Sequence, residues 1–398
     1  MTMAAAIESQ TAAASPRSAS SRIALIDIFS DLVQAETVWR SLEAQHHVST
    51  PYQRFDFLYP WQLMVGTREG LRPLVVVAYD RDHAPLLLLP LVLKQRWGVR
   101  IGHFMGGKHA TFNMALWNRD FAAAASRADL DVLFAAIRER AGVDVLALEQ
   151  QPLSWRDLPN PMSLLPHQPS VNDCPVMPMA PGAPATTRIS HSVRSRLKTK
   201  ERKLKALPGY RYHVATSDRD IERMLDAFFR IKPLRMAEQN LPNVFAEPGV
   251  EDFIRKACIT PLAGGGRVIE IHAIESDSEL VALFAGVADG YRFSMMFNTY
   301  TVSASSRFSP GLVLIRHIVD HYAERGYHAL DLGIGSDGYK KLFCKAIEPI
   351  FDCFVPLSPR GAAAAMVMST AGRAKRLVKN SPALLGLAQR LRRVGRWH

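Results

Sequence analysis

Nine prolines lie within the 33 residues from Pro152 to Pro184, and they limit the possible folds of this chain more than any other feature. Proline lacks a backbone N–H donor and fixes φ, so this stretch can be neither a continuous helix nor a central strand. The 398 residues are long for one hydrophobic core and sufficient for two. The prolines therefore indicate a linker, and we predict two domains at residues 23–180 and 181–358.

Composition and hydropathy indicate a globular protein, because 48% of the residues are hydrophobic and 22% are charged. The longest apolar run, Ala84–Leu93, contains two prolines and is half as long as the roughly 20 residues that a membrane span needs. Residues 1–22 lack the basic start and the apolar stretch of a signal peptide, so we expect a disordered tail. The four cysteines are far apart and show no metal-ligand spacing. We therefore expect reduced thiols, a cytoplasmic location and no metal site.

The net charge of +12 is concentrated in two segments. Residues 188–211 carry nine Lys or Arg and one acidic residue, and residues 354–398 carry nine Lys or Arg and no acidic residue. Such segments attract a phosphate, a lipid headgroup or a nucleic acid, or they are simply solvated surfaces. We predict a basic amphipathic tail at 359–398, in which residues 382–397 place Leu and Trp at helical spacing. A helix of this kind can make peripheral contact with the inner face of the membrane, or it can dock on a protein surface.

The apolar pattern predicts the same order of elements in both halves of the chain: strand, helix, helix, three strands, helix, strand and a closing strand. We expect residues 171–179 to join the first lobe as an edge strand, and Pro233 to interrupt a helix at 219–231. The predicted fold is α/β, with two similar lobes in tandem, each a mixed and mostly antiparallel sheet flanked by helices. Near the candidate site, the expected elements are strands at 268–274, 279–287 and 291–297, a helix at 312–325 and a strand at 329–332.

The most specific motif lies between residues 309 and 343. Its parts are Ser309-Pro310-Gly311 at a helix start, Gly326 at the helix end, Asp331 in a strand, Gly335, and Tyr339-Lys340 ahead of Phe343. In this pattern the chain resembles the CelD-like family of GNAT acetyltransferases, which is associated with bacterial cellulose and polysaccharide loci. That family is similar in architecture to the Fem-type peptidoglycan transferases, which also pair two GNAT-like lobes. The resemblance implies transfer of an acetyl group from acetyl-CoA to an amine or hydroxyl of a small-molecule or glycan acceptor.

The helix start at Ser309 is the predicted cofactor site. The first amide groups of a helix have no partner within the helix and, together with the helix dipole, they attract anions. Pro310 at the first position removes no useful hydrogen bond, and Gly311 lets a phosphate approach the backbone. The resemblance implies that Arg307, Ser309, Gly311 and Leu312 bind the pyrophosphate of coenzyme A, although this loop matches the usual GNAT loop only in part. A helix cap without a ligand is the alternative.

Four further residues are candidates for the chemistry. Asp331 is predicted to act as a general base, or else to form a buried salt bridge, for example with Lys340. Tyr339 is predicted to protonate the leaving thiolate, because a phenol and a thiol have similar pKa values, or else to be a packed side chain. Lys340 and Arg235 are predicted to bind the substrate, and simple solvation is the alternative for both. We expect backbone N–H groups of the strand at 291–297 to stabilise the oxyanion.

Two other functions remain open from the sequence. One is a Fem-like transferase that uses aminoacyl-tRNA, in which the basic segment 188–211 would contact the nucleic acid; nucleic acid is otherwise not an expected partner. The other is a non-catalytic scaffold in a polysaccharide system. In the first lobe, Gly106-Gly107-Lys108 leads into no clear helix. We therefore expect that lobe to shape the acceptor site.

Overall fold

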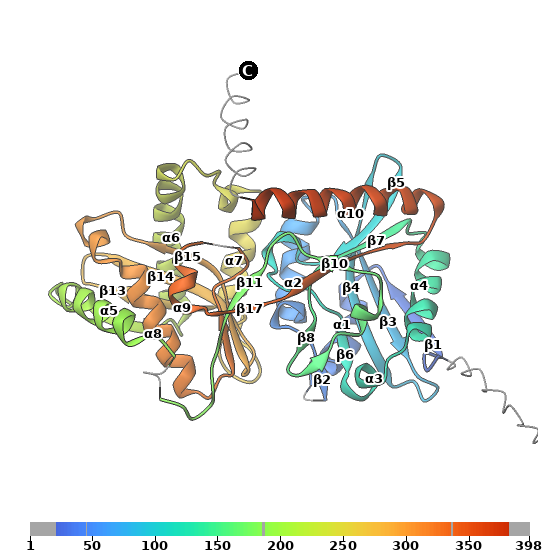
Figure 1. The fold of residues 1–398 in the computed structure, drawn as a ribbon, viewed down its shortest axis with the longest axis horizontal. Coiled ribbons are helices and arrows are strands. Elements are labelled where there is room, and N and C mark those ends of the chain that lie inside the picture. Colours follow the sequence, from blue (N-terminus) through green and yellow to red (C-terminus); the bar gives the residue numbers. More distant parts are fainter. Residues whose placement is uncertain (1–20, 45, 185–187, 336, 382–398) are drawn as a thin grey trace, which may run out of the picture.

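The computed structural model describes residues 21–44, 46–184, 188–335 and 337–381. These residues form two mixed sheets that lie side by side and are flanked by helices (Figure 1). The predicted α/β fold with two lobes is confirmed. Most of the tail predicted at residues 1–22 lies outside the described residues.

The first sheet has a core of almost entirely apolar strands. Its strands, in spatial order, are Leu25–Phe29 (β1), Arg72–Tyr79 (β3), Pro85–Arg96 (β4), Val99–Phe104 (β5), Val145–Pro152 (β7), Ile350–Pro356 (β18) and Gln168–Pro169 (β10), with His47–Val48 (β2) and Leu116–Asn118 (β6) beside β4. β3 and β4 are runs of Val and Leu that are buried on both faces, as expected for strands covered by helices. Only β5 and β7 pair in parallel among these strands. A small separate hairpin joins Ser154–Trp155 (β8) to Leu158–Pro159 (β9).

The second sheet repeats this arrangement. Its strands, in spatial order, are Arg211–Val214 (β12), Glu270–Glu275 (β13), Leu280–Ala288 (β14), Arg292–Tyr300 (β15), Ala329–Asp331 (β16), Cys174–Pro178 (β11) and Ala346–Glu348 (β17). β15 and β16 are the parallel pair, and the other neighbours are antiparallel. Both lobes therefore place one parallel pair next to a three-strand antiparallel meander.

The helices cover the faces of these two sheets. They are Leu32–Ser41 (α1), Phe55–Trp61 (α2), Arg119–Ala123 (α3), Arg127–Ala141 (α4), His191–Leu204 (α5), Asp218–Glu238 (α6), Val250–Ile259 (α7), Pro310–Glu324 (α8), Lys340–Phe343 (α9) and Pro359–Asn380 (α10). The predicted break at Pro233 is wrong, because α6 continues through this proline to Glu238. Two contacts hold the last turns of α6. Lys232 Nζ donates to the carbonyl of Asn298, and Arg235 stacks on the ring of Tyr300.

The two sheets do not follow the predicted division of the chain at residue 180, because each contains a strand from the other predicted domain. β11 pairs with β16 and β17 of the second sheet, so the prediction that it joins the first lobe is wrong. β18 pairs with β7 of the first sheet. One apolar cluster also continues from β3 and β4 into α6, α7 and β14. The lobes are therefore joined by both exchanged strands and a shared core.

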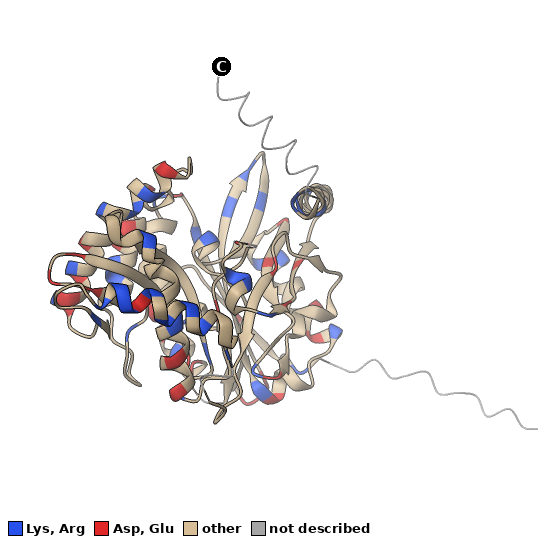
Figure 2. Ribbon diagram, turned by 60° about the vertical axis from the view of Figure 1, so that its left-hand side comes forward, with Lys and Arg blue, Asp and Glu red and all other residues tan. Residues whose placement is uncertain are grey.

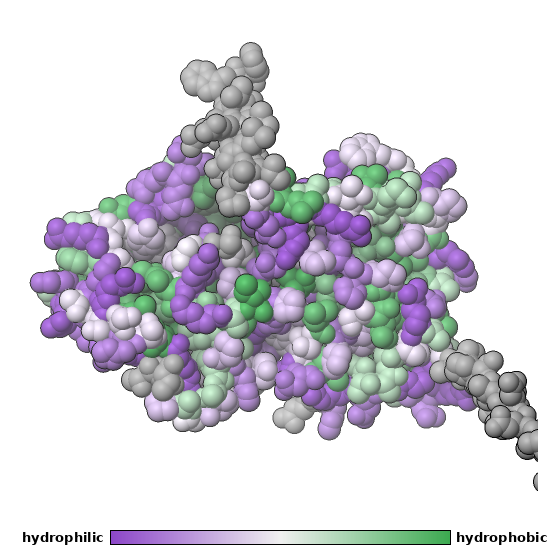
Figure 3. Space-filling model, viewed as in Figure 1, coloured by the Kyte–Doolittle hydropathy of each residue, from purple (hydrophilic) through white to green (hydrophobic). Residues whose placement is uncertain are grey.

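The helix α10 lies along the first sheet, where it packs on β18, β5 and β7 (Figure 1). Arg376 on this helix forms an ion pair of 3.0 Å with Asp173. The opposite face of α10 leaves Met366, Val367 and Leu377 exposed, and Figure 3 shows apolar and polar residues interspersed over the visible surface. Within the described part of the chain, no helix is long and apolar enough to cross a membrane. The predicted helix at 382–397 lies outside the described residues.

Candidate functional site

The parallel strands β15 and β16 separate in the middle of the second sheet. They pair only over Arg292–Ser294 and Ala329–Asp331, after which the chains diverge. In addition, the pairing of β15 with β14 shifts by one residue. Ala285 and Gly286 of β14 pair with Phe297 and Met295, which leaves Met296 as an extra residue in β15. An extra residue of this kind has no ladder partner, so its backbone groups become available at the gap. β15 and β16 thus separate at this point of the sheet, and the residue of β15 that is unpaired with β14 lies just beyond their last pair.

One cavity, of about 280 Å³, lies where α8 begins. Ser309 caps the helix in the left-handed conformation (φ 52°), and Pro310 fills the first helical position. Pro310 has no N–H group, and the N–H groups of Leu312 and Val313 donate to the Ser309 carbonyl at 3.0 and 3.2 Å, so among the described residues only the Gly311 N–H of this first turn has no backbone partner. Of the four predicted cofactor residues, Ser309, Gly311 and Leu312 line the cavity. The full lining is Phe284, Asn298, Tyr300, Ser306, Ser309, Gly311, Leu312, Ile315 and Tyr339.

A lysine from α5 adds positive charge to this helix start. Lys200 Nζ donates to Ser309 Oγ at 2.5 Å, and α5 carries further Lys and Arg residues along its length (Figure 2). The helix dipole and a half-buried ammonium group both favour an anion at the same point. The sequence indicated Lys200 only as one member of the basic segment 188–211. The contact with Ser309 depends on how α5 packs on α8, which no local pattern predicts.

A second cavity, of about 350 Å³, lies on the other side of the gap, between the two lobes. The first lobe contributes residues 108–111, and α7 contributes Phe253 and Ile254. The second lobe contributes residues 295–298 and 332–334, together with Asp337, Tyr339 and Lys340. Asn298 and Tyr339 line both cavities. A molecule at the start of α8 and a molecule between the lobes would therefore meet at these two side chains.

Tyr339 lies at this meeting point, where its side chain is partly enclosed by both cavities. Burial, and then the charge of Asp337, raise the pKa of its phenol above the usual value, while a hydrogen bond with Asn298 opposes the rise. The hydroxyl group is protonated at neutral pH, but the raised pKa makes it a weaker acid than the thiol-matched phenol that the sequence analysis predicted. The ammonium group of Lys232 donates a hydrogen bond to the backbone carbonyl of Asn298 at 2.8 Å. Burial, and then the charge of Arg235, lower the pKa of Lys232 to about 8. Asn298 and Lys232 are site residues that the sequence analysis missed.

Asp331 has a different environment from the one predicted for a general base. Its side chain is fully buried. One carboxylate oxygen accepts from Arg292 Nε at 2.7 Å and from Ser294 Oγ, and the other accepts from the Gly333 N–H at 2.9 Å. Both oxygens are occupied and neither cavity is lined by this residue. The placement gives no support to a catalytic role; the alternative of a buried salt bridge is correct, with Arg292 rather than Lys340 as the partner.

Lys340 organises the loop that follows β16. It is 3% exposed, and its ammonium group donates to the carbonyls of Gly333 (3.1 Å) and Ile334 (2.9 Å) and pairs with Asp337 (3.2 Å). Lys340 lines the cavity between the lobes, but three protein groups already surround its charge. This arrangement supports a structural role in holding the loop near Tyr339.

The two predicted arginines lie at the margin of the site. The guanidinium carbon of Arg235 lies 3.8 Å from the centre of the Tyr300 ring, which lines the cavity at α8. Arg307 is exposed, stacks on Phe308 and does not line that cavity. Among the described residues, no group of three His, Cys, Asp or Glu side chains is placed to hold a metal ion.

Comparison with known proteins shows what this chain is similar to. Residues 191–341 match the family described as Acetyltransferase (GNAT) domain. None of the curated protein sequences compared matches the chain significantly. The crystal structure of FemX is similar at 8% identity, with a TM-score of 0.57, over 85% of this chain and 100% of FemX. A conserved protein of unknown function from Bacteroides thetaiotaomicron is similar at 10% identity, with a TM-score of 0.51, over 83% of this chain and 100% of that one.

The matched range 191–341 begins with α5 and ends within α9, so it contains Lys200, the whole start of α8, and both Asn298 and Tyr339. The structural similarities extend over both lobes and show the fold. The range that is similar to the GNAT acetyltransferase domain family therefore lies in the second lobe, within a fold that the chain shares with FemX.

Proposed function

We propose that the protein transfers an acyl group from a coenzyme A thioester to an amine or hydroxyl of an acceptor. The observation that carries this proposal is the meeting of two cavities at Asn298 and Tyr339. The cavity at α8 offers an anion site for the pyrophosphate. The cavity between the lobes offers room for an acceptor, which we place among sugars and polysaccharide precursors on the basis of the resemblance to the CelD-like family.

Each part of the candidate site has its own role in the proposed reaction. The first turn of α8 and Lys200 hold the pyrophosphate, while the gap between β15 and β16 admits the thioester. Backbone N–H groups near Met296 stabilise the oxyanion that forms when the acceptor attacks. Tyr339 gives its proton to the sulfur as the C–S bond breaks, and it regains a proton from the attacking group. The products are the acylated acceptor and free coenzyme A.

The test of this proposal is native mass spectrometry with a panel of coenzyme A esters, followed by an assay of thiol release with candidate acceptors. Binding of one ester, with acceptor-dependent release of the thiol, would support acyl transfer. A protein that binds none of the esters would instead fit the scaffold function. Salt-sensitive binding of tRNA would favour an aminoacyl-tRNA-dependent transferase, a function supported by the exposed lysines and arginines of α5.

Replacing Tyr339 by Phe is expected to lower kcat by about 100-fold, because general-acid groups contribute at least about this much to rates. The affinity for coenzyme A should change less than about twofold, since the ring and its packing are retained. Thiol-release kinetics and calorimetry measure the two quantities. Tyr327→Phe is the matched control, because Tyr327 accepts from the Gly290 N–H and lines neither cavity. Wild-type turnover in the Tyr339 variant would refute its role as the acid.

Replacing Lys200 by Gln is expected to weaken coenzyme A binding by about fivefold, which corresponds to about 1 kcal/mol for one partly screened charge. The difference from the wild type should shrink as salt is added, because ions screen the attraction between the ammonium group and the phosphate. Titration calorimetry at two salt concentrations measures both effects. Lys203→Gln, which removes an exposed lysine from the same helix, should leave the affinity unchanged. Equal losses in the two variants would show that only the overall charge of α5 matters.

A further inference from the structure

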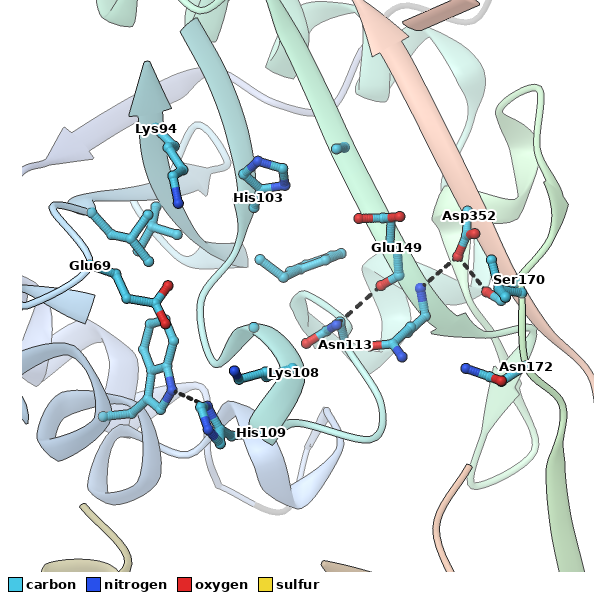
Figure 4. A pocket seen from close by; sticks show the side chains of 18 residues that line it. Glu69, Lys94, His103, Lys108, His109, Asn113, Glu149, Ser170, Asn172 and Asp352 are labelled. Carbon is cyan, nitrogen blue, oxygen red and sulfur yellow. Dashed lines mark hydrogen bonds between the residues drawn. The ribbon is translucent and has the colours of Figure 1, made fainter. Parts of the chain in front are cut away.

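The first lobe also contains a cavity beyond the end of its parallel strand pair. In the second lobe, the corresponding position is where the two cavities described above meet. β5 and β7 pair in parallel only over Ile101–His103 and Val145–Ala147, and they then separate as β15 and β16 do. A cavity of about 460 Å³ opens beyond this point (Figure 4). The sequence analysis assigned no ligand to this space.

The helix of the first lobe that corresponds to α8 has no free anion site at its start. α4 precedes β7 as α8 precedes β16, but its start carries its own carboxylate. Asp129 accepts hydrogen bonds from the backbone of Ser126 and Arg22 and from the hydroxyl of Ser21. A negative charge already occupies the positive end of the helix dipole, so a second anion would be repelled. The first lobe therefore suits a ligand with a different charge.

Two carboxylates form one wall of the cavity. Asp352 of β18 is buried, and one of its oxygens accepts from the Gln150 N–H at 2.9 Å and from the hydroxyl of Ser170. Glu149 of β7 faces the cavity beside it (Figure 4), and among the described residues its carboxylate has no hydrogen-bond or ion-pair partner. Burial, and then the charge of Asp352, raise the pKa of Glu149 to about 7. Glu149 remains exposed to solvent, and two carboxylates at one cavity wall favour a cation between them.

An amide oxygen adds a third acceptor to this wall. Asn113 is 4% exposed, and its amide nitrogen donates to the Glu149 carbonyl at 3.1 Å. Its Oδ1 atom is buried and has no hydrogen-bond partner among the described residues. In Figure 4 this oxygen lies on the side of the amide that points away from the Glu149 carbonyl, and Asn113 is one of the residues that line the cavity. A buried acceptor without a protein donor can accept a hydrogen bond from water or from a bound group.

The other charges around the cavity do not neutralise this wall. Lys108 forms an ion pair with Glu247 of the second lobe, and Lys94 lies across the cavity near Glu69 (Figure 4). Burial, and then the charge of Lys94, lower the pKa of His103 to about 4, so its ring is neutral at pH 7. Lys375 on α10 is exposed to solvent and acts on Glu149 only at long range.

We propose that this cavity binds the ammonium group of a primary amine, held by Glu149, Asp352 and the amide oxygen of Asn113. An ammonium group has three donors and no acceptor, which matches three acceptor side chains. Lys108 and His109 line both this cavity and the one between the lobes, so a longer amine bound here extends toward the acceptor side of the second lobe. The proposal does not depend on coenzyme A binding, and it stands if the proposed acyl transfer fails.

The test uses the full-length protein and 1,4-diaminobutane as the probe, with 1,4-butanediol as the uncharged control. Calorimetry should show saturable binding of the diamine and none of the diol. Glu149→Gln should weaken the binding at least about tenfold, since hydrogen bonds to charged groups are the strong ones. Glu149→Asp, which keeps the charge, should retain more affinity than Glu149→Gln. Glu139→Gln, which changes an exposed glutamate on α4, should bind as the wild type does.

The pH dependence gives a second readout. Affinity should fall as the pH is lowered from 8 to 6, because protonated Glu149 cannot pair with the ammonium group. At pH 7 binding should release protons, which calorimetry in two buffers of different ionisation enthalpy detects. Both effects should vanish in Glu149→Gln. Equal binding of the diol and the diamine, or unchanged diamine binding in Glu149→Gln, would overturn the proposal.

Discussion

Replacing Gly311 by Asp is expected to abolish the binding of coenzyme A while leaving the protein folded. Gly311 occupies the second position of α8, and a Cβ atom added there would lie 3.6 Å from Tyr300 and 3.7 Å from Phe284, which is ordinary contact. An aspartate in the first turn of a helix interacts favourably with the helix dipole, so the fold should not lose stability. The same carboxylate would occupy the site proposed for the pyrophosphate and repel it.

The expected loss of affinity for coenzyme A is at least about 100-fold, or roughly 3 kcal/mol, because charge-assisted hydrogen bonds of the pyrophosphate are replaced by repulsion. Calorimetry measures the affinity, and thermal unfolding verifies the fold. Gly311→Ala tests the contribution of size alone and should cost much less. Gly264→Asp adds the same charge at a turn where no atom lies within 4 Å of the new Cβ, and it should bind normally. If Gly311→Asp binds coenzyme A as tightly as the wild type does, the phosphate site lies elsewhere.

Local patterns predicted the elements of the second lobe because each is encoded within a few residues. The order of elements, the helix start at Ser309 and the helix end near Gly326 all follow from turn residues and apolar spacing. Ser309, Gly311 and Leu312, three of the four predicted cofactor residues, line one cavity, whereas Asp331, which was predicted beside Tyr339, lines neither cavity. Where a candidate site consists of one helix start and the loop after the next strand, the sequence is sufficient to locate these elements.

Contacts between distant segments were not predictable in the same way. β11 is a short, proline-containing strand. Nothing in its residues shows whether it lies at the edge of the first sheet, as predicted, or between β16 and β17 of the second sheet, as observed. The partner of Asp331 is similarly nonlocal, because the sequence offered Lys340 nearby while Arg292 is 39 residues away. Lys232 and Lys200 were missed for the same reason, since each acquires its role from a helix packed against the site.

Replacing Arg292 by Met is expected to lower the free energy of unfolding by about 3–5 kcal/mol, the usual cost of leaving a buried charge without its partner. Arg292 is 3% exposed, and it pairs with both Asp331 and Glu348 of the second sheet. Its guanidinium carbon also lies 4.5 Å from the ring centre of Phe112 and 5.0 Å from that of Trp155, both in the first lobe. The substitution would therefore leave the carboxylates of Asp331 and Glu348 without their cationic partner, and it would remove a contact between the lobes.

Arg223→Met is the matched control for Arg292→Met. Arg223 also pairs with two acidic residues, Asp220 and Glu275, but its side chain is 49% exposed, so its loss should cost at most about 1 kcal/mol. Denaturant unfolding measures both variants, and equal small losses would show that the buried cluster does not stabilise the fold.

The pH dependence of the Arg292 variant tests the electrostatic origin of its instability. Burial raises the pKa of Glu348, and Arg292 opposes this rise, so removing the arginine should raise that pKa further. A carboxyl group whose pKa is higher in the folded state than in the unfolded state destabilises the fold at high pH, and protonation relieves the penalty. The stability difference between Arg292→Met and the wild type should therefore shrink as the pH falls from 8 to 5. A stability difference that stays constant over this range would show that the loss comes from packing against Phe112 and Trp155. The ion pair between Arg292 and Asp331 would then not stabilise the fold.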